Sequence, residues 1–336
     1  MKRLSIDNIG FTEIGGVGEM KYTAVRFPEY IVDYSERGQV IKPLFSSSIP
    51  PTVGTDDSLT GQELLVSLCN LYRQINNPNS TEEISEAIWI WCRNNIHPYD
   101  IEYLCEIINS GKYAHIEFYD MIQQDGTFEL KRFEKDLYEL GRTFEYFFAL
   151  KRITEYNDAE CGRKLYYEGR LCDSFAFLEK YNGIEDDDDY ITQIYEDYKE
   201  LTSKLLDLFP DFNMRLRFDS KGKILYAADV KSVFDIAWYT FARMVADVAP
   251  PVDESLDYMF SQGSVLSCLA CGEYFVRHSS RQLYCNSPFC QAERNRKNRR
   301  NSYARKKEQR RTIEQKLILL QTQLFYCLCI DFFTIS

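Results

Sequence analysis

The sequence lacks the residues and motifs on which most catalytic sites depend. It contains only three histidines, His97, His115 and His278, and none of them stands in a His-Glu-x-x-His pattern. There is no Gly-x-Ser-x-Gly nucleophile elbow and no Walker-type phosphate loop. The glycine-rich stretch "IGGVGEM" lacks the spacing of a dinucleotide-binding loop, and it predicts a turn. We therefore expect no enzymatic activity.

Long apolar runs are also missing. Outside the C-terminal tail, no segment approaches the roughly 20 apolar residues that a membrane-spanning helix needs. The first residues, "MKRLSIDNIGFTEIGG", carry no apolar stretch after their charges, which is unlike a secretory signal. The cysteine count is odd, at eleven, which argues against a framework of disulfides. Together these features predict a cytoplasmic protein in a reducing compartment.

Five cysteines stand singly in segments with helical patterns. A lone cysteine in such a segment behaves as a small apolar residue. We expect all five to be buried in the core: Cys69, Cys92, Cys105, Cys161 and Cys172.

The composition predicts a packed body that is mainly helical. Hydrophobic residues make up 45% of the chain and aromatic residues 15%, which is ample for a core. Residues 1–60 contain "KYTAVRFPEYIVDY", rich in β-branched and aromatic residues, and predict an irregular segment with strands. Residues 61–255 predict a mostly helical, acidic domain. Within that domain, "RLRFDSKGKILYAAD" predicts a β-hairpin.

Apolar periodicity and capping residues predict the helix boundaries. The residues expected on the buried face of a helix over 61–75 are Leu64, Leu65, Leu68, Leu71 and Tyr72. Ser80 and Glu83 fit a capping box for the next helix. Residues 186–209 predict one helix, which Pro210 stops.

Four further cysteines form two pairs near the C-terminus, Cys268-x2-Cys271 and Cys285-x4-Cys290. Tetrahedral zinc takes four such ligands, and a Cys-x2-Cys turn supplies two of them. Gly272 suits that turn because glycine adopts positive φ without steric cost. The spacing predicts one structural Zn²⁺, because four protein ligands leave no open position for a catalytic water.

The residues around the cysteines predict a small finger. Residues 273–276 predict a strand, and Leu283 and Tyr284 predict its return strand. Cys290 then falls in the first turn of a following helix, whose N-terminus favours thiolate charge. This order is that of a treble-clef style of zinc site. Replacement of one cysteine ligand by His278 is an alternative.

The pattern "CxxCGxxF…R…YC…C…R.R..RR…R" resembles the CGNR-type zinc fingers found at the C-termini of bacterial proteins proposed to regulate transcription. The resemblance implies that the four cysteines bind zinc and that the arginine-rich helix contacts DNA. After Cys290 this chain reads Gln-Ala-Glu-Arg-Asn-Arg, where the family has Gly-Asn-Arg. The matched positions are Cys268, Cys271, Gly272, Phe275, Arg281, Cys285, Cys290, Arg294, Arg296 and Arg300.

Charge is concentrated in one segment. Residues 291–311 carry ten Lys and Arg against two Glu, a net charge of +8, so the rest of the chain carries −19. An acidic body with one basic segment indicates a polyanion as the partner of that segment. The segment has no proline or glycine and can continue the helix. At 100° per residue, seven cations share a sector of about 140°: Arg296, Arg299, Arg300, Lys306, Lys307, Arg310 and Arg311.

We expect nucleic acid to bind this helix, with DNA favoured over RNA. A solvated charged helix, and a helix that contacts acidic protein surface, are the alternatives. The residues predicted to contact nucleic acid are Arg281, Arg294, Arg296, Arg299, Arg300, Lys306, Lys307 and Arg310.

The C-terminal tail, residues 312–336, is strongly apolar but is interrupted by Gln321, Gln323 and Asp331. These polar residues favour docking on the body, or pairing between protomers, over a membrane anchor. Cys327 and Cys329 have no second pair nearby and are not predicted to be ligands.

The predicted architecture is therefore mainly α. A helical body with a small β content precedes a four-cysteine zinc finger, built of a β-hairpin and a basic helix, over residues 265–311. The predicted function is that of a zinc-binding, DNA-binding transcription regulator with a helical regulatory domain. A zinc-stabilised adaptor for protein partners is the main alternative. A treble-clef nuclease would need histidines around the metal, which this chain lacks.

Overall fold

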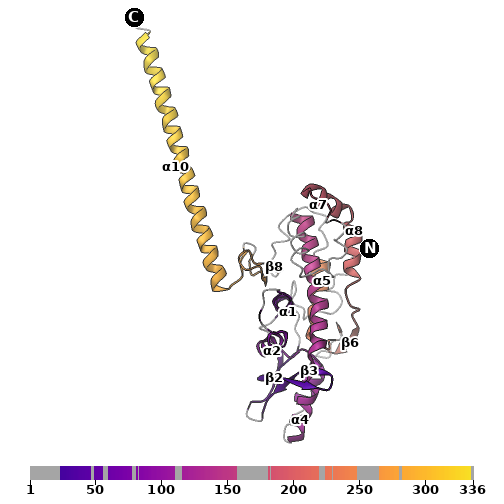
Figure 1. The fold of residues 1–336 in the computed structure, drawn as a ribbon. Helices are drawn as coiled ribbons and strands as arrows, with labels where there is room; N and C mark the ends of the chain where they lie inside the picture. The colour runs from indigo at the N-terminus through magenta and orange to yellow at the C-terminus, as the bar shows by residue number, and fades with distance from the viewer. Residues whose placement is uncertain are drawn as a thin grey trace. The chain divides into compact units, whose positions relative to one another are not determined.

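A computed structural model describes most of the chain, and its fold is mainly α-helical with short antiparallel strands (Figure 1). The chain divides into two compact units. Unit 1 comprises Met1–Val265 and Tyr274–Ser280, and unit 2 comprises Leu266–Glu273 and Arg281–Ser336. The described residues are 23–46, 49–55, 60–77, 81, 83–109, 116–156, 181, 183–218, 224–228, 230–247, 265–279 and 282–333.

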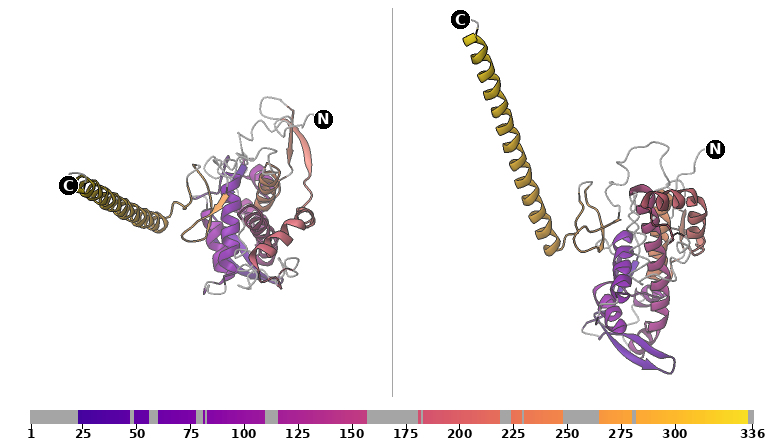
Figure 2. Two further views of the ribbon diagram at one scale, coloured as in Figure 1. Left: turned by 90° about the horizontal axis from the view of Figure 1, so that it is seen from above. Right: turned by 45° about the horizontal axis from the view of Figure 1, so that its top comes forward.

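The helices of unit 1 form its core. Helix α1 contacts both α5 and α9, and Figure 2 shows α1 and α5 side by side. The described helices of this unit are α1 (Gly61–Ile75), α2 (Ile84–Asn94), α3 (Ile101–Asn109), α4 (Ile116–Asp125), α5 (Leu130–Tyr156), α7 (Asp187–Glu196), α8 (Tyr198–Leu206) and α9 (Val233–Asp247).

Helix α1 confirms the periodicity read from the sequence. Its predicted apolar face is buried, with each of the five side chains less than 5% exposed. A capping box closes its N-terminus: Glu63 N donates to Thr60 Oγ1 over 3.2 Å, and Thr60 N donates to Glu63 Oε2 over 2.9 Å.

Two predicted helix boundaries are wrong. Glu83 is the N-cap residue of α2 and makes no side-chain capping bond, so it is not the third helical residue of a capping box that begins at Ser80. Ser80 itself lies outside the described residues. The single helix expected over residues 186–209 is two helices that meet at Asp197. The Tyr181 hydroxyl donates to the Asp197 carboxylate at this break over 2.6 Å.

Unit 1 also contains short antiparallel β-sheets. Strand β1 (Thr23–Arg26) pairs with β4 (Thr52–Thr55). Strand β3 (Gly38–Leu44) lies between β2 (Glu29–Ser35) and β5 (Phe128–Glu129). The predicted hairpin is confirmed as β6 (Met214–Phe218) paired with β7 (Ile224–Ala228).

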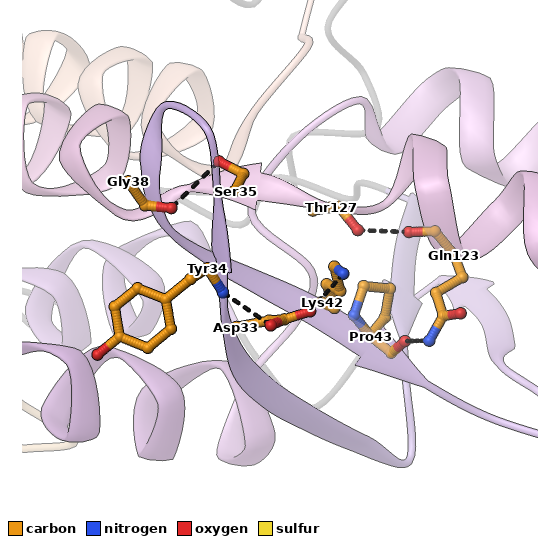
Figure 3. A network of polar contacts seen from close by, with 8 residues as sticks. All are labelled: Asp33, Tyr34, Ser35, Gly38, Lys42, Pro43, Gln123 and Thr127. Atoms are coloured by element: carbon orange, nitrogen blue, oxygen red, sulfur yellow. Dashed lines mark hydrogen bonds and ion pairs between the residues drawn. The ribbon is translucent and has the colours of Figure 1, made fainter.

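The β2–β3 hairpin is fixed by a short polar network (Figure 3). Gly38 has a φ of 122°, which the tight turn requires, and its carbonyl accepts from the Ser35 hydroxyl. Lys42 pairs with the Asp33 carboxylate on the neighbouring strand. Gln123 of α4 donates to the Pro43 carbonyl over 3.0 Å and so joins the sheet to the helices.

Buried single cysteines behave as predicted where the structure describes them. Cys69, Cys92 and Cys105 are buried in the apolar core. Cys161 and Cys172 lie outside the described residues. These thiols therefore act as small apolar side chains.

His97 is buried in the same core and is 1% exposed. Its Nδ1 atom lies 3.3 Å from the Tyr30 hydroxyl, and the Phe27 ring meets its ring edge to face at 5.1 Å. Burial lowers the pKa of His97 to about 3. The imidazole is thus neutral in the folded protein at all ordinary pH values.

This buried imidazole predicts that unit 1 loses stability in mild acid. The unfolded chain takes up a proton at His97 near pH 6.5, whereas the folded chain does so only near pH 3. Stability is therefore complete above pH 6.5 and falls as the pH drops through this window. Between pH 7.5 and 5.5 the free energy of unfolding should fall by about 1.4 kcal/mol from this group.

Urea unfolding followed by tryptophan fluorescence checks this expectation, because Trp89, Trp91 and Trp238 all lie in unit 1. The matched control is His97→Gln, which has no proton to take up in this range. The variant should lose less stability than the wild type between the two pH values. An equal loss in both proteins would contradict the assignment.

Strand β9 (Tyr274–Val276) belongs to unit 1 and is held against α1. Asn70 donates to the Tyr274 carbonyl over 2.9 Å, and Tyr274 N donates to Asn70 Oδ1 over 2.8 Å. The Tyr274 ring lies 5.0 Å from Phe144 and 4.9 Å from Phe148 between centroids. The Arg73 guanidinium lies 4.9 Å from the centre of the same ring. The Asn70 side-chain amide thus pairs with the backbone of Tyr274 and ties β9 to α1.

Candidate metal centre

The first cysteine pair stands in a tight chain reversal. It follows β8 (Val265–Ser267), which forms a two-stranded sheet with β9. Cys268 N donates to the Glu273 carbonyl over 2.7 Å, and Gly272 N donates to the Cys268 carbonyl over 2.9 Å. Gly272 has a φ of 78°, as the sequence predicted for this position. Cys271 is exposed at the tip of the turn.

The second pair stands where the last helix begins. Helix α10 runs from Pro288 to Phe333, so Cys290 lies in its first turn and Cys285 just before it. Cys285 N donates to Cys268 Sγ over 3.3 Å, and Gln291 Nε2 donates to the Cys285 carbonyl over 2.7 Å. The first bond attaches the segment before α10 to the first cysteine turn, and the second attaches that segment to α10 itself.

Four sulfur atoms converge at this place. The Sγ atoms of Cys268, Cys271, Cys285 and Cys290 all lie within 4.8 Å of one another. The sulfurs of Cys271 and Cys285 are 3.8 Å apart. Zinc–sulfur bonds of about 2.3 Å at tetrahedral angles place two sulfurs about 3.8 Å apart. The cluster therefore fits one metal ion held by four cysteines.

The pKa values of two thiols in the cluster are shifted in opposite directions. Burial raises the pKa of Cys268, but backbone N–H groups aimed at its sulfur outweigh burial and lower the pKa to about 6. Ala270 N and Cys285 N are among these donors. Burial raises the pKa of Cys285 to about 11, and contacts with neighbouring sulfurs add to the rise. The cluster by itself favours a thiolate at Cys268, whereas a bound cation would favour four.

The predicted return strand is wrong. Leu283 and Tyr284 are not in a strand, and β9 pairs instead with β8, which precedes the first cysteine. Leu269 N donates to the Leu283 carbonyl over 3.2 Å. This bond, together with the bond from Cys285 N to Cys268 Sγ, pairs residues 283–285 with the cysteine turn. Residues 283–285 therefore do not pair with β9.

His278 is not among the residues that could hold the metal. Within the described part of the chain, the group that could bind an ion consists of the four cysteines alone. His278 is exposed, and His115 lies outside the described residues.

The basic segment forms part of one continuous helix, α10, as predicted for residues 291–311 (Figure 1). Arg281 lies outside the described residues, and nothing is described of the Arg310 side chain. Arg294 donates to Gln291 over 3.2 Å, and Arg296 forms an ion pair with Glu293. At 100° per residue Arg294 lies about 160° around the helix from Arg296, so these two do not share a face.

The remaining predicted contacts are exposed cations on one side of α10. Among the residues that the structure describes, they make no ion pair: Arg299, Arg300, Lys306 and Lys307. We define the basic face of α10 by its cations: Arg296, Arg299, Arg300, Lys306, Lys307, Arg310 and Arg311.

Two aromatic residues on this side were not singled out from the sequence. Phe289 is 69% exposed and Tyr303 is 74% exposed. They are separated by fourteen residues, two heptads, which brings them to the same side of a helix. The sequence could have revealed them, because Phe289, Arg296, Tyr303 and Arg310 are each seven residues apart and so share one side of a helix.

Comparison with known proteins gives no match. No protein-family model, no curated protein and no solved structure is similar to this chain. In the described part of the chain, no helix combines the length and the apolar character that a membrane crossing requires.

Proposed function

We propose that this protein binds one structural Zn²⁺ through its four clustered cysteines and binds DNA through the basic face of α10. The observation that carries the proposal is the position of Cys290. This cysteine of the cluster lies in the first turn of the helix that presents the cations. A metal bound there would fix the start of the helix relative to the cysteine turn.

Zinc is the metal that this donor set favours. Four thiolates at tetrahedral spacing are typical of structural zinc sites, and such sites leave no position for water. The cysteine turn and the start of α10, which both belong to unit 2, would together form a treble-clef-like finger. The resemblance to CGNR-type fingers supports the same reading, although the order of strands differs from the one that the sequence predicted.

Phosphate is the ligand that the basic face favours. Arg299, Arg300, Lys306 and Lys307 are exposed and make no ion pair among the described residues. Such cations release counterions from a nucleic acid when they bind it. The rest of the chain carries −19, so its charge repels the same polyanion. Unit 1 would then serve as a regulatory or sensing domain in a cytoplasmic transcription regulator. The resemblance favours DNA over RNA.

Removal of two cations from the basic face should weaken DNA binding for every sequence. We expect Arg299→Ala/Arg300→Ala to lower affinity for duplex DNA by about tenfold at low salt and to reduce the salt slope by about 2. Fluorescence anisotropy with a labelled duplex, over a range of salt concentrations, measures both quantities.

The matched control is Lys297→Ala/Arg305→Ala, which removes the same charge from outside the basic face. It should reduce affinity much less than the first variant. Equal losses in the two double variants would show that net charge alone matters and would contradict a binding face. Absence of any DNA binding by zinc-loaded protein at low salt would reject the proposed function.

A protein-interaction adaptor is the second candidate, and one observation favours it. Leu269, Leu283 and Phe289 are exposed apolar side chains of unit 2, and Leu269 and Leu283 are joined by a backbone hydrogen bond. Leu269 and Leu283 thus lie side by side, and neighbouring exposed apolar residues favour a protein-binding surface. In that case Leu269→Ser would abolish capture of a protein partner, and neither double variant of α10 would change it.

A further inference from the structure

The basic face of α10 carries an aromatic side chain at its centre. Tyr303 stands three and four residues from four exposed cations: Arg299, Arg300, Lys306 and Lys307. Residues at these spacings are surface neighbours on a helix, with Cβ atoms about 5–6 Å apart. Every neighbouring position of Tyr303 along this face is therefore a cation.

The Tyr303 ring is open to a ligand. It is 74% exposed, and among the described residues no guanidinium or ammonium group lies over it. Exposure alone does not mark a binding residue, because Tyr34 of β2 is 75% exposed and its hydroxyl accepts a hydrogen bond from Gln39. The surroundings distinguish Tyr303, since a polyanion bound by the four cations would pass directly over its ring.

A second aromatic side chain extends the pattern. Phe289, Arg296, Tyr303 and Arg310 recur every seven residues along α10. A seven-residue step turns an α-helix by about 700°, so these positions drift by only about 20° per step. One strip of the helix thus alternates aromatic and cationic residues. Alternation of this kind suits a strand whose phosphates and bases must both be bound.

We propose that Tyr303 stacks on an unpaired base and that the basic face therefore prefers single-stranded DNA to duplex DNA. The inference rests on the proposed DNA binding and names the form of the ligand. In a duplex the faces of the bases are covered by their neighbours, so an exposed ring gains little from it. In a single strand each base offers an open face, and stacking on an aromatic side chain adds to the phosphate contacts.

The test separates base stacking from phosphate charge by using two single strands of equal length. One is a fluorescently labelled thymidine strand of about 20 nucleotides, and the other is an abasic strand with the same phosphates. A duplex of the same length is the third probe. Anisotropy titrations use the whole, zinc-loaded chain as wild type, Tyr303→Ala, Tyr303→Phe and Lys306→Ala.

The wild type should bind the thymidine strand about tenfold more tightly than the abasic strand. Tyr303→Ala should remove most of that ratio and change duplex affinity by no more than about twofold. Tyr303→Phe should keep the ratio, because the ring and not the hydroxyl makes the contact. Lys306→Ala should weaken binding of all three probes and leave the ratio unchanged, because it removes a phosphate contact.

Four outcomes would overturn the proposal. A wild-type ratio near one, or a ratio that survives in Tyr303→Ala, would show that Tyr303 does not stack on bases, while DNA binding itself would stand. An equal loss for single-stranded and duplex probes in Tyr303→Ala would assign the ring a general role in the helix. No binding of any probe at low salt would reject the proposed function together with this inference.

Discussion

The Cys285→Ser variant is expected to lose its metal and the ordered structure of the cysteine turn. Among the described residues of unit 2, the buried ones are Cys268, Tyr284, Cys285 and Cys290. Three of these four are members of the cysteine cluster. A segment with so small a core depends on its metal, and apparent binding free energies for structural zinc are about 10–16 kcal/mol. A serine hydroxyl is a poor replacement for a zinc-bound thiolate.

Metal analysis of the purified protein measures this effect. The wild type should contain about one zinc per chain, and Cys285→Ser should contain almost none. Cys105→Ala is the control, because Cys105 is a buried cysteine of unit 1 that is not in the cluster. It should cost some stability and retain the zinc. Zinc retained in Cys285→Ser, or a wild type without metal, would refute the assignment of the cluster.

The Gly141→Ala variant is expected to destabilise unit 1 by about 3 kcal/mol. Gly141 lies in α5 where that helix contacts α1. A Cβ atom at this position would lie 2.1 Å from Cγ of Tyr72, whose ring is buried. Alanine favours a helix over glycine by about 1 kcal/mol, but the overlap would force the ring or the two helices to move.

Urea unfolding followed by tryptophan fluorescence measures this change. Gly183→Ala is the control, because nothing lies within 4 Å of a Cβ built there. Its effect should stay within about 0.5 kcal/mol. A Tyr72→Ala/Gly141→Ala double variant should lose less than the sum of the two single losses, because the overlap disappears with the ring. An unchanged midpoint in Gly141→Ala would contradict the close approach of α1 and α5.

The sequence predicts elements well where the signal is local. The apolar spacing of α1 and the pairing of β6 with β7 both follow from residues within one short segment. The four-cysteine cluster was predictable for a similar reason. The second pair follows the Cys-x2-Cys turn at a short distance, and four cysteines spaced in this way are typical of a structural zinc site.

Features that depend on distant residues could not be predicted. The capping-box pattern occurs at both Thr60 and Ser80, but α1 begins with such a box whereas the N-cap residue of α2 is Glu83. Asp197, at the break between α7 and α8, accepts a hydrogen bond from Tyr181, which is 16 residues away in the sequence. The attachment of β9 depends on Asn70, which is 204 residues away in the sequence.

One measurement tests the account most directly: the affinity of the whole, zinc-loaded protein for a DNA duplex of about 20 base pairs as salt is varied. If several cations of the basic face contact phosphates, the logarithm of the association constant should fall linearly with the logarithm of salt, with a slope of about −3 to −6. A slope near zero, or no binding at about 50 mM salt, would contradict a nucleic-acid-binding helix.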